Sequence, residues 1–257
     1  MKIIVSVKQV PARDSALRVN EAGKWLDESD LSYEMNEPDA YALEEALQLR
    51  EKLGGEVVVI CAGPQRVLQT VREALAKGAD RAIHIGVEEP ENLDALGTAR
   101  LLAKGIEAES PELILTGLQS DDLGYGQTGV ILAELLGYAH ATIVMEVEPQ
   151  GGDMVRVKRE LEDGWFQNIV LPLPTVLTIQ SGIKKLRYAT LMGIKKAKTK
   201  EVKTVSAADL GIDTTPMVAM GRVYLPQRAK QAQILSGNAK EVAHQLIEKL
   251  RFEARVI

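Results

Sequence analysis

Apolar residues in the first 150 positions form short continuous runs that alternate with segments of helical period. The runs predict strands at residues 2–7, 56–62, 81–87, 111–117 and 141–149. The segments between them predict helices at residues 36–55, 63–80, 93–109 and 126–137. Because the runs are nearly unbroken in Val and Ile, they are typical of parallel strands covered on both faces.

The first helix has the clearest boundaries. Asn36 occupies the expected N-cap position, Asp39 follows three residues later and Pro38 lies in the first turn. The pair Gly54-Gly55 ends the helical period. The order of elements predicts an α/β fold in which helices cover both faces of a parallel sheet.

Right-handed crossovers place binding sites at the carboxyl ends of parallel strands, where the strand order reverses. Three loops follow such ends, at residues 6–15, 61–65 and 117–128. We therefore expect these loops to line one crevice.

The pattern changes after residue 153. Residues 154–180 predict two or three antiparallel strands that turn at Asp163-Gly164, with Pro172 and Pro174 favouring an edge strand or linker. We place one domain at residues 1–203 and an extended C-terminal arm with a final helix at 204–257. The final helix is amphipathic, and the arm is expected to pack on a partner subunit, although an ordinary packed C-terminus fits the composition equally well.

Composition excludes several classes of protein. The chain has 257 residues, 46% hydrophobic and 26% charged, and no apolar run approaches the roughly 18 residues of a membrane span. The N-terminus lacks a signal-peptide pattern, which favours a cytoplasmic protein without membrane insertion. Cys61 is the single cysteine and the three histidines have no ligand spacing, so we predict neither a disulfide nor a metal site.

Charge is concentrated in one segment, residues 184–203. It contains eight basic residues and one acidic residue, so it carries +7 while the rest of the chain, at −5 overall, carries −12. The basic residues are Lys184, Lys185, Arg187, Lys195, Lys196, Lys198, Lys200 and Lys203. With a single aromatic residue and an acidic remainder, the segment favours a partner surface or a solvated arm over nucleic-acid binding.

The loop after the fourth strand reads SDDLGYGQTG. It lacks the lysine of a Walker A loop and the carboxylate spacing of a calcium loop, and its GxGxxG pattern follows the fourth strand instead of the first. Glycines and a helix N-terminus nevertheless suit a phosphate, and the aspartates suit ribose hydroxyls or a base edge. The residues favour nucleotide binding without hydrolysis, and the alternative is a plain loop whose aspartates cap the helix.

Several longer segments resemble the β subunit of electron transfer flavoprotein over about residues 1–212. They are VSVKQV, MNEPDAYALEEALQL, CAGP, REALAKGADRAIHI and VKRELEDGWFQNIVLPLPTVLTIQSGIKKLRYATLMGIKKAKTKEV. The resemblance implies a heterodimer in which an α subunit holds most of an FAD and the β subunit encloses it and binds AMP. It also implies electron transfer from acyl-CoA or other flavin dehydrogenases to a quinone oxidoreductase, with no catalytic residue of the β chain's own.

The resemblance assigns residues to two sites. The cofactor-binding residues would be Ser6, Asn36, Glu37, Pro38, Asp39, Ala62, Gly117, Leu118, Gln119, Ser120, Asp121, Asp122, Leu123, Gly124, Tyr125, Gly126, Gln127 and Thr128. Gly126 replaces the family's asparagine. Within the recognition loop at about residues 184–203, Leu191 would anchor a dehydrogenase, surrounded by Lys195, Lys196 and Lys198; alternatively Leu191 packs beneath its own loop.

Two other functions remain open from the sequence. Some members of the family bind a second FAD in the β subunit and bifurcate electrons, but their loop carries a proline where Val130 follows Gln-Thr-Gly here. A stand-alone ATP-binding module would account for residues 1–145, but not for the basic segment or the C-terminal arm.

Overall fold

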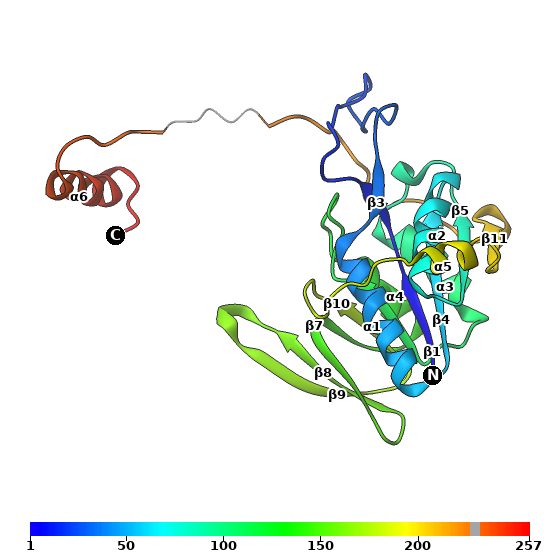
Figure 1. Cartoon of the computed structure of the whole chain (residues 1–257). Coiled ribbons are helices and arrows are strands. Elements are labelled where there is room, and N and C mark those ends of the chain that lie inside the picture. Colours follow the sequence, from blue (N-terminus) through cyan, green and yellow to red (C-terminus); the bar gives the residue numbers. More distant parts are fainter. Residues whose placement is uncertain (227–231) are drawn as a thin grey trace. The chain divides into compact units, whose positions relative to one another are not determined.

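The computed structural model describes residues 1–226 and 232–257 (Figure 1). Two compact units make up the chain, Met1–Val223 and Tyr224–Ile257. The first contains a nine-stranded sheet in the order β11-β5-β4-β1-β6-β10-β7-β8-β9. Every pairing from β11 to β7 is parallel, and β7, β8 and β9 pair in antiparallel fashion.

The strands follow the predicted apolar runs closely. In the large sheet they are β1 (Lys2–Ser6), β4 (Glu56–Gly63), β5 (Arg81–Gly86), β6 (Leu113–Gly117), β7 (Ala139–Gln150), β8 (Met154–Glu160), β9 (Phe166–Pro172), β10 (Thr175–Ile179) and β11 (Val202–Ser206). A separate two-stranded antiparallel ribbon, β2 (Gln9–Pro11) with β3 (Tyr33–Met35), was not expected.

Helices cover both faces of the sheet, which confirms the predicted fold class (Figure 1). One face packs against α1 (Glu37–Leu53), α2 (Leu68–Lys77) and α5 (Leu191–Ala197). The other packs against α3 (Ala95–Glu107) and α4 (Thr128–Leu136). The alternation of Ile3 and Val5 with Ile4 divides β1 between the two cores, so the strand is apolar throughout.

The sheet contains a topological switch between β1 and β6. From β1 the chain moves outward through β4 and β5, and then returns through α3 to place β6 on the opposite side of β1. The loops after β1 and β6 therefore diverge from adjacent strands, which is where ligands bind in open α/β sheets.

The prediction for residues 154–180 was wrong at its third strand. β8 and β9 form the expected antiparallel hairpin, and β9 lies at the sheet edge as its proline favoured. β10, however, inserts in parallel between β6 and β7, and all five of its residues are buried. Its five β-branched or apolar residues suit a central parallel strand, because both of its faces are covered.

The basic segment is also more structured than an extended arm. It contains α5 and part of β11, which extends the sheet in parallel beside β5. Helix α5 packs against α2 so closely that a Cβ on Gly193 would lie 2.2 Å from the Ala76 carbonyl oxygen.

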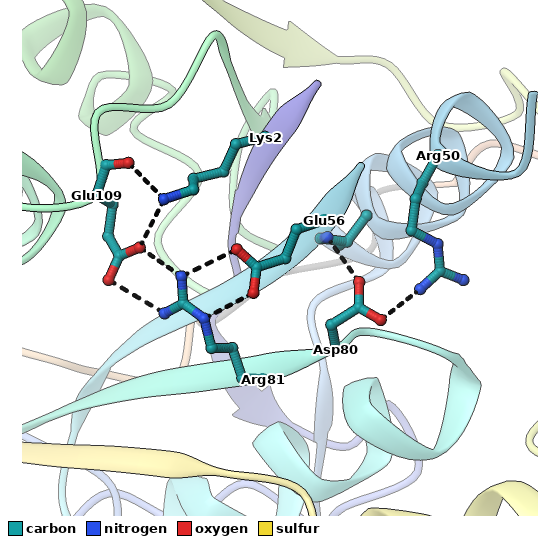
Figure 2. A network of polar contacts seen from close by, with 7 residues as sticks. Lys2, Arg50, Glu56, Asp80, Arg81 and Glu109 are labelled. Atoms are coloured by element: carbon teal, nitrogen blue, oxygen red, sulfur yellow. Dashed lines mark hydrogen bonds and ion pairs between the residues drawn. The ribbon is translucent and has the colours of Figure 1, made fainter. Parts of the chain in front are cut away.

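An ion-pair network closes the amino ends of the strands. Figure 2 shows the Arg81 guanidinium between two carboxylates, with Nε 2.8 Å from Glu56 Oε1 and Nη1 3.1 Å from Glu109 Oε1. Lys2 Nζ donates to the Glu109 carbonyl at 2.8 Å. Asp80 accepts from Arg50 at 2.8 Å and from the Val57 N–H at 2.8 Å, so it joins α1 to β4.

The second unit contains α6 (Ala239–Glu248), which continues as a π-helical turn over Lys249–Glu253. Asn238 caps α6 in a capping box with Glu241. No described residue of this unit is buried, and Leu246, Ile247 and Phe252 are 48%, 50% and 68% exposed. Residues 227–231 of the expected arm lie outside the described residues.

Candidate functional site

A cavity of about 560 Å³ opens at the carboxyl ends of β1, β4 and β6. The three loops expected to form one crevice all contribute to its wall. Of the predicted cofactor-binding residues, the wall includes Ser6, Asn36, Asp39, Ala62 and residues 117–123 and 125–128. Glu37, Pro38 and Gly124 do not line the cavity, although they belong to the same helix start and loop.

Asp39 joins three elements beneath the cavity. Its carboxylate is buried and accepts the Lys8 N–H at 2.7 Å and the Gly117 N–H at 2.9 Å, so the start of α1 binds the ends of β1 and β6. Burial raises its pKa to about 7, and the two backbone hydrogen bonds oppose that rise. A Cβ on Gly117 would lie 2.3 Å from Asp39 Oδ1, so this junction requires glycine.

Asn36 occupies the N-cap position of α1, but its side chain does not cap the helix. Its Nδ2 donates to the Gln119 carbonyl at 3.0 Å, and its Oδ1 accepts the Asp121 N–H at 2.9 Å. The expected capping role is therefore wrong, because the side chain instead holds the loop after β6.

Two cations that the sequence reading did not single out bind the same loop. Lys8 Nζ lies 2.6 Å from Asp122 Oδ1 and 3.3 Å from Ser120 Oγ. Arg13 hydrogen-bonds to Glu37, and its Nη2 lies 3.6 Å from Asp121 Oδ2. Both cations lie within residues 6–15, the predicted loop that was expected to line the crevice, so their position was the available signal.

The loop after β6 leads into α4 without a side-chain cap. Gln127 is the N-cap residue and makes no capping hydrogen bond, and Asp122 is engaged by Lys8 and by the Leu123 N–H. The alternative in which the aspartates cap this helix is therefore wrong. Because the first N–H groups of a helix lack intrahelical partners, α4 directs hydrogen-bond donors to the cavity wall at Gln127 and Thr128.

Gly126 has φ +62°, in the left-handed region that glycine and asparagine enter most readily. The asparagine that the resemblance implies at this position would fit the same backbone conformation, so Gly126 differs from it only in lacking the side chain.

A second polar cluster lines the cavity on the side of the β2–β3 ribbon. The Arg66 guanidinium lies 4.1 Å from the centre of the Tyr33 ring and donates to Gln9 Oε1 at 2.8 Å and Glu28 Oε1 at 3.1 Å. Glu28 also accepts from Trp25 Nε1 at 3.0 Å. Burial raises the pKa of Tyr33 to about 12. No sequence motif predicts this cluster, since its members come from four separate segments.

Other chemistry is limited in the described part of the chain. No group of three or more His, Cys, Asp or Glu side chains there gathers in a metal-binding arrangement. Cys61 is buried, and burial raises its pKa to about 12, so it is an unreactive thiol. No helix within residues 1–226 and 232–257 is long and apolar enough to span a membrane.

The predicted recognition residues lie on a separate surface formed by α5. Leu191 is the first residue of the helix and is 83% exposed, so the alternative in which it packs beneath its own loop is wrong. Tyr188, Met192 and Ile194 are also exposed; together with Leu191 they form what we call the α5 patch. Lys195, Lys196 and Lys198 are exposed at the C-terminal end of the helix.

Three other cations of the basic segment are used within the fold. Lys184 Nζ lies 3.5 Å from Glu45 Oε2, and Arg187 pairs with Glu44 and Glu51. Lys200 Nζ donates to the Leu75 and Ala79 carbonyls at the end of α2. The charge available to a partner is therefore concentrated beside α5.

Comparison with known proteins identifies relatives along the whole chain. A family model described as electron transfer flavoprotein domain matches residues 24–210. The chain is 39% identical to the electron transfer flavoprotein subunit beta of Methylophilus methylotrophus, over 96% of this chain and 97% of the relative. It is 37% identical to the Bradyrhizobium diazoefficiens subunit beta over the full length of both, and 35% identical to that of Homo sapiens over 100% of this chain and 99% of the relative.

Proposed function

The chain belongs to the electron transfer flavoprotein family, among its β subunits, and from this premise we propose that it works in a heterodimer with an α subunit. The family consists of electron carriers. In the proposed heterodimer the α subunit holds most of an FAD. The pair accepts electrons from acyl-CoA or related flavin dehydrogenases and passes them to a quinone oxidoreductase.

We further propose that the cavity at the β1–β6 switch binds AMP. Three features fit this ligand: a largely apolar wall for a base, the uncapped start of α4 for a phosphate, and Ser120 and Asp122 as polar partners for a ribose. The uncapped α4 N-terminus beside this wall is the observation that carries the proposal. Neither a Walker lysine nor a metal cluster accompanies it among the described residues, so the proposed role is binding without hydrolysis.

Bound FAD would supply the redox chemistry of the heterodimer. This chain's contribution is to enclose the cofactor, to hold the AMP site together through Asp39 and Asn36, and to present the α5 patch to an electron donor. An exposed apolar centre beside cations suits transient docking, because burial supplies affinity and charge raises the association rate.

The cofactor proposal is tested by co-expressing the chain with its α subunit and releasing the bound nucleotides for identification. We expect one FAD and one AMP per heterodimer. Two FAD and no AMP would instead identify the electron-bifurcating arrangement, and a stable monomer that hydrolyses ATP would identify a stand-alone nucleotide-binding module.

The docking proposal is tested with Leu191→Ala in the same heterodimer. The KM for a reduced acyl-CoA dehydrogenase should rise about tenfold, as expected when a central interface residue is truncated. FAD and AMP contents should stay at the wild-type level. An unchanged KM would remove Leu191 from the docking surface.

A further inference from the structure

Arg187 joins the α5 patch to the body of the fold through an unusually complete set of hydrogen bonds. It lies in the segment that leaves β10, four residues before Leu191. Both of its partners, Glu44 and Glu51, lie on α1, about 140 residues earlier in the chain. We call the three residues the Arg187 clamp.

The inner half of the clamp is buried. The Glu44 side chain is only 4% exposed, and it accepts Arg187 Nε at 2.8 Å, Nη2 at 3.0 Å and the Arg187 backbone N–H at 3.2 Å. Gln48 Nε2 also donates to Glu44, at 2.7 Å. Burial alone would raise the pKa of Glu44, but the Arg187 hydrogen bonds outweigh it and keep the pKa below its ordinary value.

The outer half of the clamp is the pairing of the Arg187 guanidinium with Glu51. Glu51 accepts Nη1 at 2.6 Å and Nη2 at 3.2 Å, so Arg187 has carboxylates along two edges. Two-edged pairing of this kind fixes the position and the rotation of the guanidinium plane, which an ammonium group cannot do.

Beyond Arg187, α5 is fixed at three further points. Thr190 Oγ1 accepts the Gly193 N–H at 3.0 Å and caps the helix, while Gly193 presses on the Ala76 carbonyl of α2. At the other end, Arg72 Nη1 donates to the Ala197 and Lys200 carbonyls at 2.6 and 2.9 Å. The α5 patch therefore lies between two polar anchors, and the Arg187 clamp is the one on its N-terminal side, where Tyr188 and Leu191 are exposed.

We propose that the Arg187 clamp positions the α5 patch, so that Arg187 is a positioning residue for dehydrogenase docking although it makes no contact with the partner. The inference rests on the proposed docking function of Leu191. Its physical reason is preorganisation: a seven-residue helix is marginally stable by itself, and each side chain left to be ordered on binding weakens association.

The test compares four variants in the heterodimer with the α subunit. Arg187→Gln removes the clamp, Arg187→Lys keeps the charge without the two-edged pairing, and Glu51→Gln weakens only the exposed half. Lys52→Gln is the matched control, because it removes one positive charge from an exposed neighbour of Glu51 that takes no part in the clamp.

Two readouts are taken: kinetics of reduction by an acyl-CoA dehydrogenase, and hydrogen exchange of the amides at residues 188–197. For Arg187→Gln we expect the KM to rise about tenfold with little change in kcat, and exchange in this segment to rise about as much. Arg187→Lys and Glu51→Gln should change both in the same direction by less, and Lys52→Gln should leave both within about twofold. FAD content should be unchanged, which excludes misfolding as the cause.

The proposed positioning role is overturned if hydrogen exchange at residues 188–197 in Arg187→Gln equals that of the wild type. It is also overturned if Arg187→Gln has the wild-type KM while Leu191→Ala has a raised KM. The proposed docking function fails separately, if Leu191→Ala is reduced as well as the wild type.

Discussion

The two ends of the same parallel sheet use charged residues in opposite ways. At the amino ends, Arg81 lies between two carboxylates, Lys2 donates to Glu109, and Arg50 pairs with Asp80 (Figure 2). At the carboxyl ends, Lys8 and Arg13 hold a loop over a cavity of about 560 Å³. The first arrangement closes the fold, whereas the second fixes the shape of an opening and leaves the donors of α4 available.

The largest expected difference between the two ends of the sheet is the pH dependence of stability that Asp39 gives to the carboxyl ends. Its pKa of about 7 exceeds the ordinary 3.8, so between these values the folded chain holds a proton that the unfolded chain has lost. This group's contribution to stability is therefore greatest below about pH 4, falls as pH rises to about 7 and is constant above that. The full change is roughly 4 kcal/mol.

Asp39→Asn should lack that pH-dependent component. The free energy of unfolding of wild type and variant, measured by denaturant titration from pH 4 to pH 8, should differ in slope across this range. Asp122→Asn is the contrasting control, since Lys8 outweighs burial and keeps the pKa of Asp122 low, so its contribution is lost on acidification. Parallel curves for wild type and Asp39→Asn would contradict the assignment.

Gly117→Ala should damage the crevice end directly. The new Cβ would meet Asp39 Oδ1 at 2.3 Å and the Pro38 Cβ at 2.7 Å, so the start of α1 must separate from β6. We expect about 3 kcal/mol of destabilisation, in the upper range for overpacking, and a lower AMP content of the heterodimer. Gly151→Ala, where no atom lies within 4 Å of the added carbon, should change the unfolding free energy by less than about 0.5 kcal/mol.

Arg81→Leu should destabilise the opposite end without reaching the crevice. It leaves Glu109, whose side chain is 12% exposed, without its main partner. A fully buried pair would lose about 3–5 kcal/mol, and partial exposure reduces the expectation to about 2 kcal/mol. AMP content should remain at the wild-type level at 25 °C; a parallel loss of nucleotide would show that the two ends are not independent.

Lys8→Gln should have the smallest effect on stability. The Lys8 and Asp122 side chains are 40% and 22% exposed, so the free energy of unfolding should fall by less than about 1 kcal/mol. Dissociation of AMP should nevertheless accelerate, because the loop at residues 118–128 loses its tie to β1. A loss of stability as large as that of Arg81→Leu would remove the distinction between the two ends.

Local patterns predicted much of this fold. Unbroken Val and Ile runs located the strands around the crevice, and the order of elements located the three loops that meet there. The place of β10 in the sheet was not predicted. Pro172 and Pro174, just before residues 175–179, favoured an edge strand, and the strands that pair with these residues are more than 30 residues earlier in the chain. The available signal for a central strand was that all five of these residues are β-branched or apolar.

The polar side chains were harder to place than the backbone. Glu44 is a charged residue on an amphipathic helix, and nothing local indicates that it is buried, because its partner Arg187 is 143 residues away. Asn36 was placed correctly at the helix start, but its hydrogen bonds go to a loop more than 80 residues later. Motif reasoning found a loop that lines the cavity, whereas the residues that hold this loop in place could be identified only from the tertiary structure.

The close approach of Gly193 to α2 also has a consequence for how the proposed docking surface can diversify. Position 193 cannot accept a residue with a side chain unless α2 moves, because the backbone of α2 occupies that space. Positions 188, 191, 192 and 194 point outward and carry no such restriction. In the proposed docking role, the partner preference of the α5 patch can therefore change over evolutionary time by exchange of these exposed side chains, while α5 keeps its place.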